Sequence, residues 1–203
     1  QHQFREPAAG RRARRPPPPD LLAHEMFFQR DENANVQNSI TYRERIMSVA
    51  RGSPQADVER LPPVAPEADL GYVLDAVRLA RAALPAGIPL IGFAGAPFTL
   101  ASYAIEGGST RTFTRTKTLM YQAPDTWHLL LGKLAELVGR YLAAQARAGA
   151  QALQLFDSWV GCLSPQDYRT YVLPHSRRAL ALAAEAGVPV IYFGTGTAPF
   201  LED

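Results

Sequence analysis

P-L-I-G-F-A-G, residues 89–95, is the stretch that decides the fold. It is short and apolar, and proline and glycine bound it, which is typical of a buried β-strand. Two further stretches have the same character: A-L-Q-L-F-D at 152–157 and V-P-V-I-Y-F-G at 188–194. Longer segments with apolar residues at helical spacing separate them. This alternation predicts an α/β protein with a parallel sheet.

The helical segments begin and end at recognisable residues. Asp69 is a candidate N-cap for the first helix. Pro124 opens a long second helix that stops at Gly149, because glycine tolerates the left-handed conformation that ends many helices. Ser164, followed by a proline, predicts a third helix that stops at Gly187. The sequence therefore predicts about three strand–helix units.

Composition limits the class of protein. Of the 203 residues, 47% are hydrophobic and 20% charged, which suits a folded core, but roughly 250 residues are needed for an eight-stranded α/β barrel. Cys162 is the only cysteine, which excludes a disulfide framework and a cysteine-based metal site. No apolar run reaches the roughly 18 residues of a membrane span, and a net charge of +2 gives no case for nucleic-acid binding. We therefore expect a cytoplasmic protein that binds neither membrane nor nucleic acid.

The first 52 residues have a different character. R-R-A-R-R-P-P-P-P at 11–19 is basic, and its prolines forbid a helix. No core periodicity follows before about residue 53. We therefore predict a disordered basic segment at 1–52, foreign to the fold, and a folded domain at 53–203. The alternative for the basic run is a ligand segment for nucleic acid or an SH3-type domain.

Small and polar residues follow each predicted strand, where parallel α/β folds place their sites. Tyr103 lies on the segment that leaves the first strand, and its phenol can bind a polar substrate or fill the core. Asp157 and Ser158 end the second strand. A carboxylate there can act as a base, and a hydroxyl can bind a carboxylate. Spacing alone thus gives a site face but no reaction.

Other polar groups near these loops have plain structural alternatives. G-T-G-T at 194–197 can cradle a phosphate, although it matches no phosphate or dinucleotide fingerprint. Arg111 and Arg115 can meet carboxylates or form a solvated helix face. His128 and His175 have no metal-ligand spacing with the cysteine, so we predict structural or exposed roles for them and no metal site.

Read continuously, residues 89–103, P-L-I-G-F-A-G-A-P-F-T-L-A-S-Y, resemble the uroporphyrinogen decarboxylase family. Four further stretches resemble that family in its order: I-E-G-G-S (105–109), A-G-A-Q-A-L-Q-L-F-D-S-W-V-G-C-L-S-P-Q-D-Y (148–168), Y-V-L-P-H (171–175) and V-P-V-I-Y-F-G-T-G-T (188–197). The resemblance covers residues 56–203. It implies the central part of a distorted (β/α)8 TIM barrel, here about three βα units, and therefore an incomplete chain.

The resemblance also implies a reaction, that of a carboxy-lyase (a decarboxylase) in porphyrin and heme biosynthesis. Family members remove the carboxyl groups of the four acetate arms of uroporphyrinogen III and release coproporphyrinogen III. They use no metal and no organic cofactor, and they commonly form homodimers. By resemblance, Tyr103 and Ser158 contact the substrate, while Phe93 and Phe156 line the macrocycle pocket.

The motifs that carry the family's charged groups are missing from this sequence. It contains no M-R-Q-A-G-R type arginine motif and no F-S-D type segment, and the family's late histidine is expected beyond Asp203. We therefore assign no catalytic residue and expect impaired activity. The alternatives are a non-catalytic paralogue or dimerisation fragment, and a corrinoid-dependent methyltransferase of the same superfamily. The methyltransferase needs an H-x-C zinc motif that the chain lacks.

Overall fold

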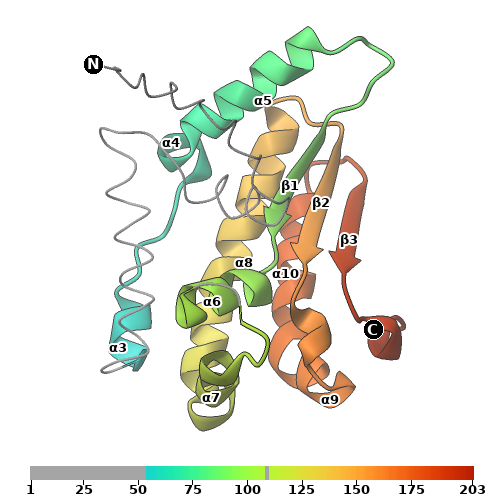
Figure 1. Cartoon of the computed structure of the whole chain (residues 1–203). Coiled ribbons are helices and arrows are strands. Elements are labelled where there is room, and N and C mark those ends of the chain that lie inside the picture. Colours follow the sequence, from blue (N-terminus) through green and yellow to red (C-terminus); the bar gives the residue numbers. More distant parts are fainter. Residues whose placement is uncertain (1–53, 108–109) are drawn as a thin grey trace, which may run out of the picture. The chain divides into compact units, whose positions relative to one another are not determined.

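Three parallel strands lie at the centre of the computed structural model, which describes residues 54–107 and 110–203 (Figure 1). The strands are β1 (Ile91–Gly95), β2 (Ala152–Asp157) and β3 (Val190–Gly194), in the order β1-β2-β3. Ala94 aligns with Leu155, and Leu155 aligns with Tyr192. The predicted α/β class and the parallel sheet are confirmed. The predicted disordered segment at 1–52 lies outside the described residues.

Helices connect the strands and continue beyond them (Figure 1). The α-helices are α3 (Pro54–Glu59), α4 (Pro66–Asp69), α5 (Gly71–Ala83), α6 (Pro97–Glu106), α7 (Thr114–Gln122), α8 (Pro124–Arg147), α9 (Pro165–Asp167) and α10 (Leu173–Ala184). Shorter turns are the 3-10 helices η1 (Val160–Cys162) and η3 (Ala198–Phe200) and the π-helix η2 (Tyr168–Val172). Helices α6, α7 and α9 lie at the carboxyl ends of the strands.

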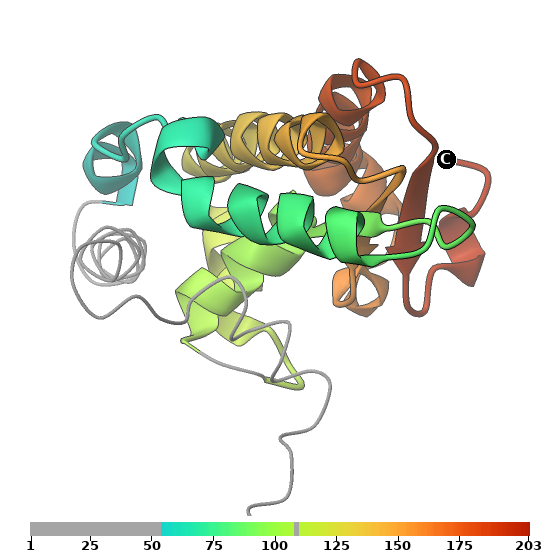
Figure 2. The same cartoon turned by 90° about the horizontal axis from the view of Figure 1, so that it is seen from above.

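One face of the sheet is covered by α8 and α10, which also pack against each other (Figure 2). Leu153 and Leu155 of β2 point to this face and are fully buried. Gly139 lies where α8 meets α10. A Cβ atom there would lie 2.5 Å from the Cβ of Leu182 and 2.9 Å from the carbonyl oxygen of Ala179. Glycine is therefore required for the two helices to approach this closely.

The opposite face of the sheet is exposed and apolar. We call it the exposed sheet face, and its apolar side chains are Ile91, Phe93, Phe156, Ile191 and Phe193. Ile91, Ile191 and Phe193 are 46%, 44% and 42% exposed. Successive residues of a strand point to opposite faces of the sheet. The residues of the exposed sheet face therefore alternate along each strand with residues that point toward α8 and α10.

The predicted start of the first helix was wrong. Asp69 is not the N-cap of the helix that follows it. It is the last residue of α4, and its carboxylate accepts a hydrogen bond from the main-chain N–H of Ala65 at 2.8 Å. Helix α5 instead has Leu70 as its N-cap, with no side-chain hydrogen bond. The carboxylate is used by the turn before it because α4 also needs a partner for its first N–H groups.

The third predicted helix is interrupted. Its N-cap is confirmed, since the Ser164 hydroxyl accepts a hydrogen bond from the main-chain N–H of Asp167 at 3.1 Å. The following turn is the π-helix η2, in which the N–H of Leu173 donates to the carbonyl of Tyr168. Pro174 has no N–H to continue the α-helical pattern, and the wider turn accommodates it.

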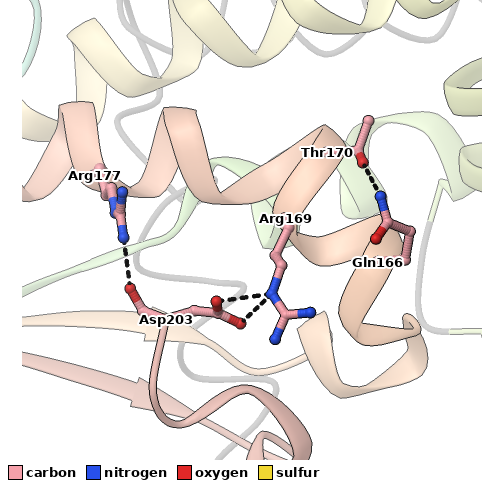
Figure 3. Close-up of polar contacts among 5 residues, drawn as sticks. All are labelled: Gln166, Arg169, Thr170, Arg177 and Asp203. Carbon is pink, nitrogen blue, oxygen red and sulfur yellow. Dashed lines mark hydrogen bonds and ion pairs between the residues drawn. The ribbon is translucent and has the colours of Figure 1, made fainter.

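The segment after β3 is tied to η2 and α10. Both oxygens of the Asp203 carboxylate share the single N–H of Arg169 Nε, at 2.8 and 3.0 Å. The main-chain oxygen of Asp203 accepts a hydrogen bond from Arg177 at 2.9 Å (Figure 3). The ring of Phe200 stacks on Tyr168 with 4.4 Å between the ring centres. These contacts fix the end of the loop that leaves β3.

Candidate functional site

A row of three phenylalanines, one from each strand, lies on the exposed sheet face. The rings of Phe93 and Phe156 meet edge to face with 5.8 Å between their centres, and Phe156 and Phe193 do so at 5.5 Å. Phe193 aligns with Phe156 in the strand register. Sequence reasoning selected Phe93 and Phe156 but missed Phe193, which period-two alternation along V-I-Y-F-G places on the same face. The row suits a flat apolar ring system.

Phe93 is held in place from the helix layer. The buried carboxamide of Gln145, on α8, accepts a hydrogen bond from the N–H of Phe93 at 3.0 Å and donates one to its carbonyl at 2.9 Å. A Cβ atom at Gly92 would lie 2.9 Å from Gln145 Oε1. Glycine at this position therefore lets the carboxamide reach the edge of β1. The first member of the phenylalanine row sits on a fixed backbone.

Tyr103 and Ser158 both lie at the carboxyl edge, by which we mean the carboxyl ends of the strands and the loops that follow. Tyr103 is on α6, and only Ala96, the N-cap of that helix, lies between the end of β1 and the first residue of α6. Ser158 directly follows β2, and Trp159 comes next. The Tyr103 and Trp159 rings meet edge to face with 5.9 Å between their centres. The structure thus brings Tyr103 together with the Ser158–Trp159 segment.

Phe113 also contacts Trp159. Its ring is buried and lies 5.8 Å from Trp159 and 6.5 Å from Phe98, measured between ring centres. Its backbone has φ of 50° and ψ of 38°, the left-handed region that a residue with a Cβ rarely adopts. Buried ring contacts on two sides hold this strained turn.

The three basic residues of this region have different surroundings. The Lys117 ammonium donates to the carbonyl of Cys162 at 2.8 Å and so holds the loop after β2. Arg111 and Arg115 are exposed on either side of the strained turn. Within residues 54–107 and 110–203, no carboxylate pairs with either arginine.

Asp157 faces away from the predicted site. It is fully buried on the covered face, where it accepts hydrogen bonds from the Thr99 hydroxyl and the Tyr192 hydroxyl, each at 2.9 Å. Burial raises the pKa of Asp157 to about 6, although the two hydrogen bonds favour the charged form. This geometry does not support the base role considered for the carboxylate, because Asp157 is buried and does not reach the exposed sheet face. Asp157 links α6, β2 and β3 beneath the carboxyl edge.

The G-T-G-T loop is engaged by its neighbour. The Thr195 hydroxyl donates to the main-chain oxygen of Ser158. Gly196 has φ of 68° and packs against Gly161 in the loop after β2. The loop considered as a phosphate cradle therefore supports the segment that carries Ser158.

His128 and His175 pair with each other between α8 and α10. Nδ1 of His128 lies 2.9 Å from Nε2 of His175, and the His128 ring stacks on Tyr171. Burial and the neighbouring imidazole lower the pKa of His175 to about 4. In the part of the chain that the structure describes, no three His, Cys, Asp or Glu side chains gather to hold a metal ion. The sequence left a structural and an exposed role open for these histidines, and in the structure the two rings pair with each other.

Comparison with protein-family models matches residues 39–203 to the family described as uroporphyrinogen decarboxylase (URO-D). The chain belongs to the uroporphyrinogen decarboxylase family. The match begins at residue 39, earlier than residue 56, where the sequence motifs begin, and it includes residues 39–52 of the predicted N-terminal segment.

Three curated relatives, each named uroporphyrinogen decarboxylase, illustrate the similarity. The chain is 49% identical to the protein of Carboxydothermus hydrogenoformans over 175 residues, which are 86% of this chain and 47% of that protein. It is 57% identical to those of Thermus thermophilus and Sorangium cellulosum over 146 and 148 residues, 42% of each relative. The chain therefore spans less than half the length of these relatives. No helix among the described residues has the length and apolar character to cross a membrane.

Proposed function

We propose that this chain supplies part of the substrate site of a uroporphyrinogen decarboxylase. The observation that carries the proposal is the phenylalanine row on the exposed sheet face, with Tyr103 and Ser158 at its carboxyl edge. A porphyrinogen combines an apolar macrocycle with carboxylate arms. A row of aromatic rings beside hydroxyl donors matches both parts.

The proposal includes the finer architecture. We infer that the three strands are part of a (β/α)8 barrel and that the exposed sheet face points to its inside. Support comes from the parallel pairing of all three strands and from α8 and α10, which lie on one face only. In such barrels the site lies at the carboxyl ends of the strands, where Tyr103 and Ser158 are found.

The proposed chemistry removes one carboxyl group at a time. Protonation of a pyrrole ring creates an electron sink, and the bond between the acetate methylene and its carboxylate then breaks. Its electron pair moves into the ring, and carbon dioxide leaves. The methylene carbon takes up one proton and becomes a methyl group, and the ring then releases the proton that it had taken up. Each of the four steps therefore consumes one proton overall and releases one carbon dioxide.

In this scheme the described residues bind and orient the substrate. Phe93, Phe156 and Phe193 pack against the macrocycle, and the hydroxyls of Tyr103 and Ser158 donate to its carboxylate arms. A hydrogen bond to a charged group contributes about 1.5–3 kcal/mol. None of these side chains supplies a cation or a carboxylate to the reacting ring. We therefore expect this chain to bind the substrate and to turn it over poorly.

Binding of uroporphyrin III, the stable oxidised form of the substrate, tests the site. We expect Tyr103→Phe and Ser158→Ala each to raise the dissociation constant about tenfold, the equivalent of about 1.4 kcal/mol. Tyr72→Phe is the matched control, because Tyr72 is an exposed tyrosine on α5 rather than at the carboxyl edge. Equal binding by the Tyr103 and Tyr72 variants would refute the proposed site.

Turnover separates this proposal from a non-catalytic paralogue. The chain is incubated without oxygen with uroporphyrinogen III, and the products are separated by chromatography. Slow formation of coproporphyrinogen III supports a decarboxylase, whereas binding with no product at all supports the non-catalytic alternative. We further propose a cytoplasmic protein that forms homodimers, as the resemblance implies. Sedimentation equilibrium of the chain tests the dimer.

A further inference from the structure

The loops that leave β2 and β3 meet through their backbones at two glycines. A Cβ atom at Gly161 would lie 2.1 Å from the carbonyl oxygen of Thr195 and 2.8 Å from the Cα of Gly196. A Cβ atom at Gly196 would lie 3.3 Å from the Cα of Gly161, and its φ of 68° disfavours any side chain. This contact therefore leaves no room for a side chain at Gly161, and the left-handed backbone favours glycine at Gly196.

The β3 loop is fixed at both ends of this contact. On one side, the Thr195 hydroxyl donates to the main-chain oxygen of Ser158. On the other, Phe200 stacks on Tyr168. Asp203 is held there by Arg169 of η2 and by Arg177 of α10 (Figure 3). The β3 loop is therefore a rigid support against which the β2 loop rests.

The supported segment carries the site. Ser158 and Trp159 lie between the end of β2 and η1, which contains Gly161. The Trp159 ring contacts the rings of Tyr103 and Phe113. A displacement of the β2 loop at Gly161 therefore moves Trp159, and with it the packing of Tyr103.

We propose that Gly161 and Gly196 are positioning residues for the substrate site. Their backbone contact sets the place of the Ser158–Trp159 segment, and Trp159 in turn sets the ring of Tyr103. This inference rests on the proposed function, since it assigns the role of these loops toward the porphyrinogen. It also replaces the phosphate-cradle interpretation of the G-T-G-T loop with a supporting one.

The test compares Gly161→Ala and Gly196→Ala with Gly132→Ala. Gly132 is the matched control, because nothing lies within 4 Å of a Cβ atom built there. The chain has two tryptophans, so labelling with 5-fluorotryptophan gives two fluorine NMR signals. The Trp159 signal reports the position of the loop. The Trp127 signal reports the core, because that ring is fully buried on α8. Uroporphyrin III binding is measured on the same samples.

We expect both site variants to shift the Trp159 signal, leave the Trp127 signal in place and weaken uroporphyrin III binding at least tenfold. The control variant should change neither signal nor binding. An unmoved Trp159 signal, or a moved signal with unchanged binding, would overturn the proposal. So would loss of both signals in Gly161→Ala, because the contact would then maintain the fold rather than the site.

Failure of the proposed function gives a different result. If the unmodified chain does not bind uroporphyrin III, the substrate assignment fails. The shift of the Trp159 signal still decides whether the glycine contact positions the loop. Gly196→Asn provides a graded comparison, because asparagine tolerates the left-handed conformation better than alanine. Its Trp159 signal should shift less than that of Gly196→Ala.

Discussion

Replacing Asp157 with asparagine tests the role of a buried carboxylate beneath the carboxyl edge. In the native chain, Asp157 accepts hydrogen bonds from Thr99 and Tyr192, and it is fully buried. Asparagine has nearly the same shape. Its oxygen can accept from Thr99, and its amide can donate to the Tyr192 oxygen. The substitution therefore removes the charge while keeping both contacts.

The expected effect depends on pH with a defined sign. Burial raises the pKa of Asp157 from its ordinary 3.8 to about 6 in the folded chain. Between these values the folded state binds more protons than the unfolded state, so stability falls as pH rises. One pKa unit corresponds to about 1.4 kcal/mol. Because the carboxyl group is already partly ionised in the unfolded chain at pH 4, the native chain loses about 2 kcal/mol between pH 4 and pH 7 through this group. Asp157→Asn has no such loss.

Urea unfolding followed by circular dichroism at several pH values measures this difference. Subtracting the native from the variant free energy of unfolding cancels the other titrating groups. We expect the difference to rise by about 2 kcal/mol from pH 4 to pH 7 in favour of the asparagine variant. Tyr192→Phe should extend the loss to higher pH, because it removes a donor that favours the charged carboxylate. A difference that does not vary with pH would refute the reasoning.

Three further predictions concern the titration of His175, the packing of α8 against α10 and the exposed sheet face. His175 has a pKa lowered to about 4, so the folded state binds fewer protons than the unfolded state below pH 6.5, and stability falls as pH is lowered. His175→Gln, which keeps a partner for His128, should reduce this loss by about 1–2 kcal/mol in urea unfolding at pH 5, allowing for partial exposure. Gly139→Ala should lower the free energy of unfolding by about 1–3 kcal/mol, because the added methyl group overpacks the contact between α8 and α10. Gly132→Ala should leave the free energy of unfolding unchanged or raise it, and thermal unfolding of both variants measures the difference. The chain should self-associate in light scattering through the exposed sheet face, and Ile191→Lys should reduce this.

The strands could be predicted from the sequence, but part of the helical structure could not. Each strand is short, apolar and bounded by proline or glycine, so its signal is local. Helix α6 lacks such a signal, because nearly all of Pro97–Glu106 is buried and no polar face marks its period. Residue Asp69 was misassigned because a carboxylate before a helix looks the same whether it serves that helix or the preceding turn.

The candidate site could also be predicted only where the sequence carries a local signal. Tyr103, Phe93 and Phe156 were selected as candidates through a continuous motif rather than through geometry. Phe193 was missed because the third strand was read as one apolar run rather than by the face to which each residue points. Contacts between distant loops, such as that between Gly161 and Gly196, have no local sequence signal and need the fold.

The end of β2 shows why position along a strand is not enough to assign a role. Phe156 and Asp157 are neighbours, yet alternation places Phe156 on the exposed sheet face and Asp157 on the covered one. The partners follow this division, since Phe156 contacts aromatic rings and Asp157 accepts hydrogen bonds from the hydroxyls of Thr99 and Tyr192. A buried carboxylate without those hydroxyls would be costly, so Thr99 and Tyr192 are explained by Asp157 and not by a substrate. A polar residue at a strand end is therefore a site candidate only when its face is also the exposed one.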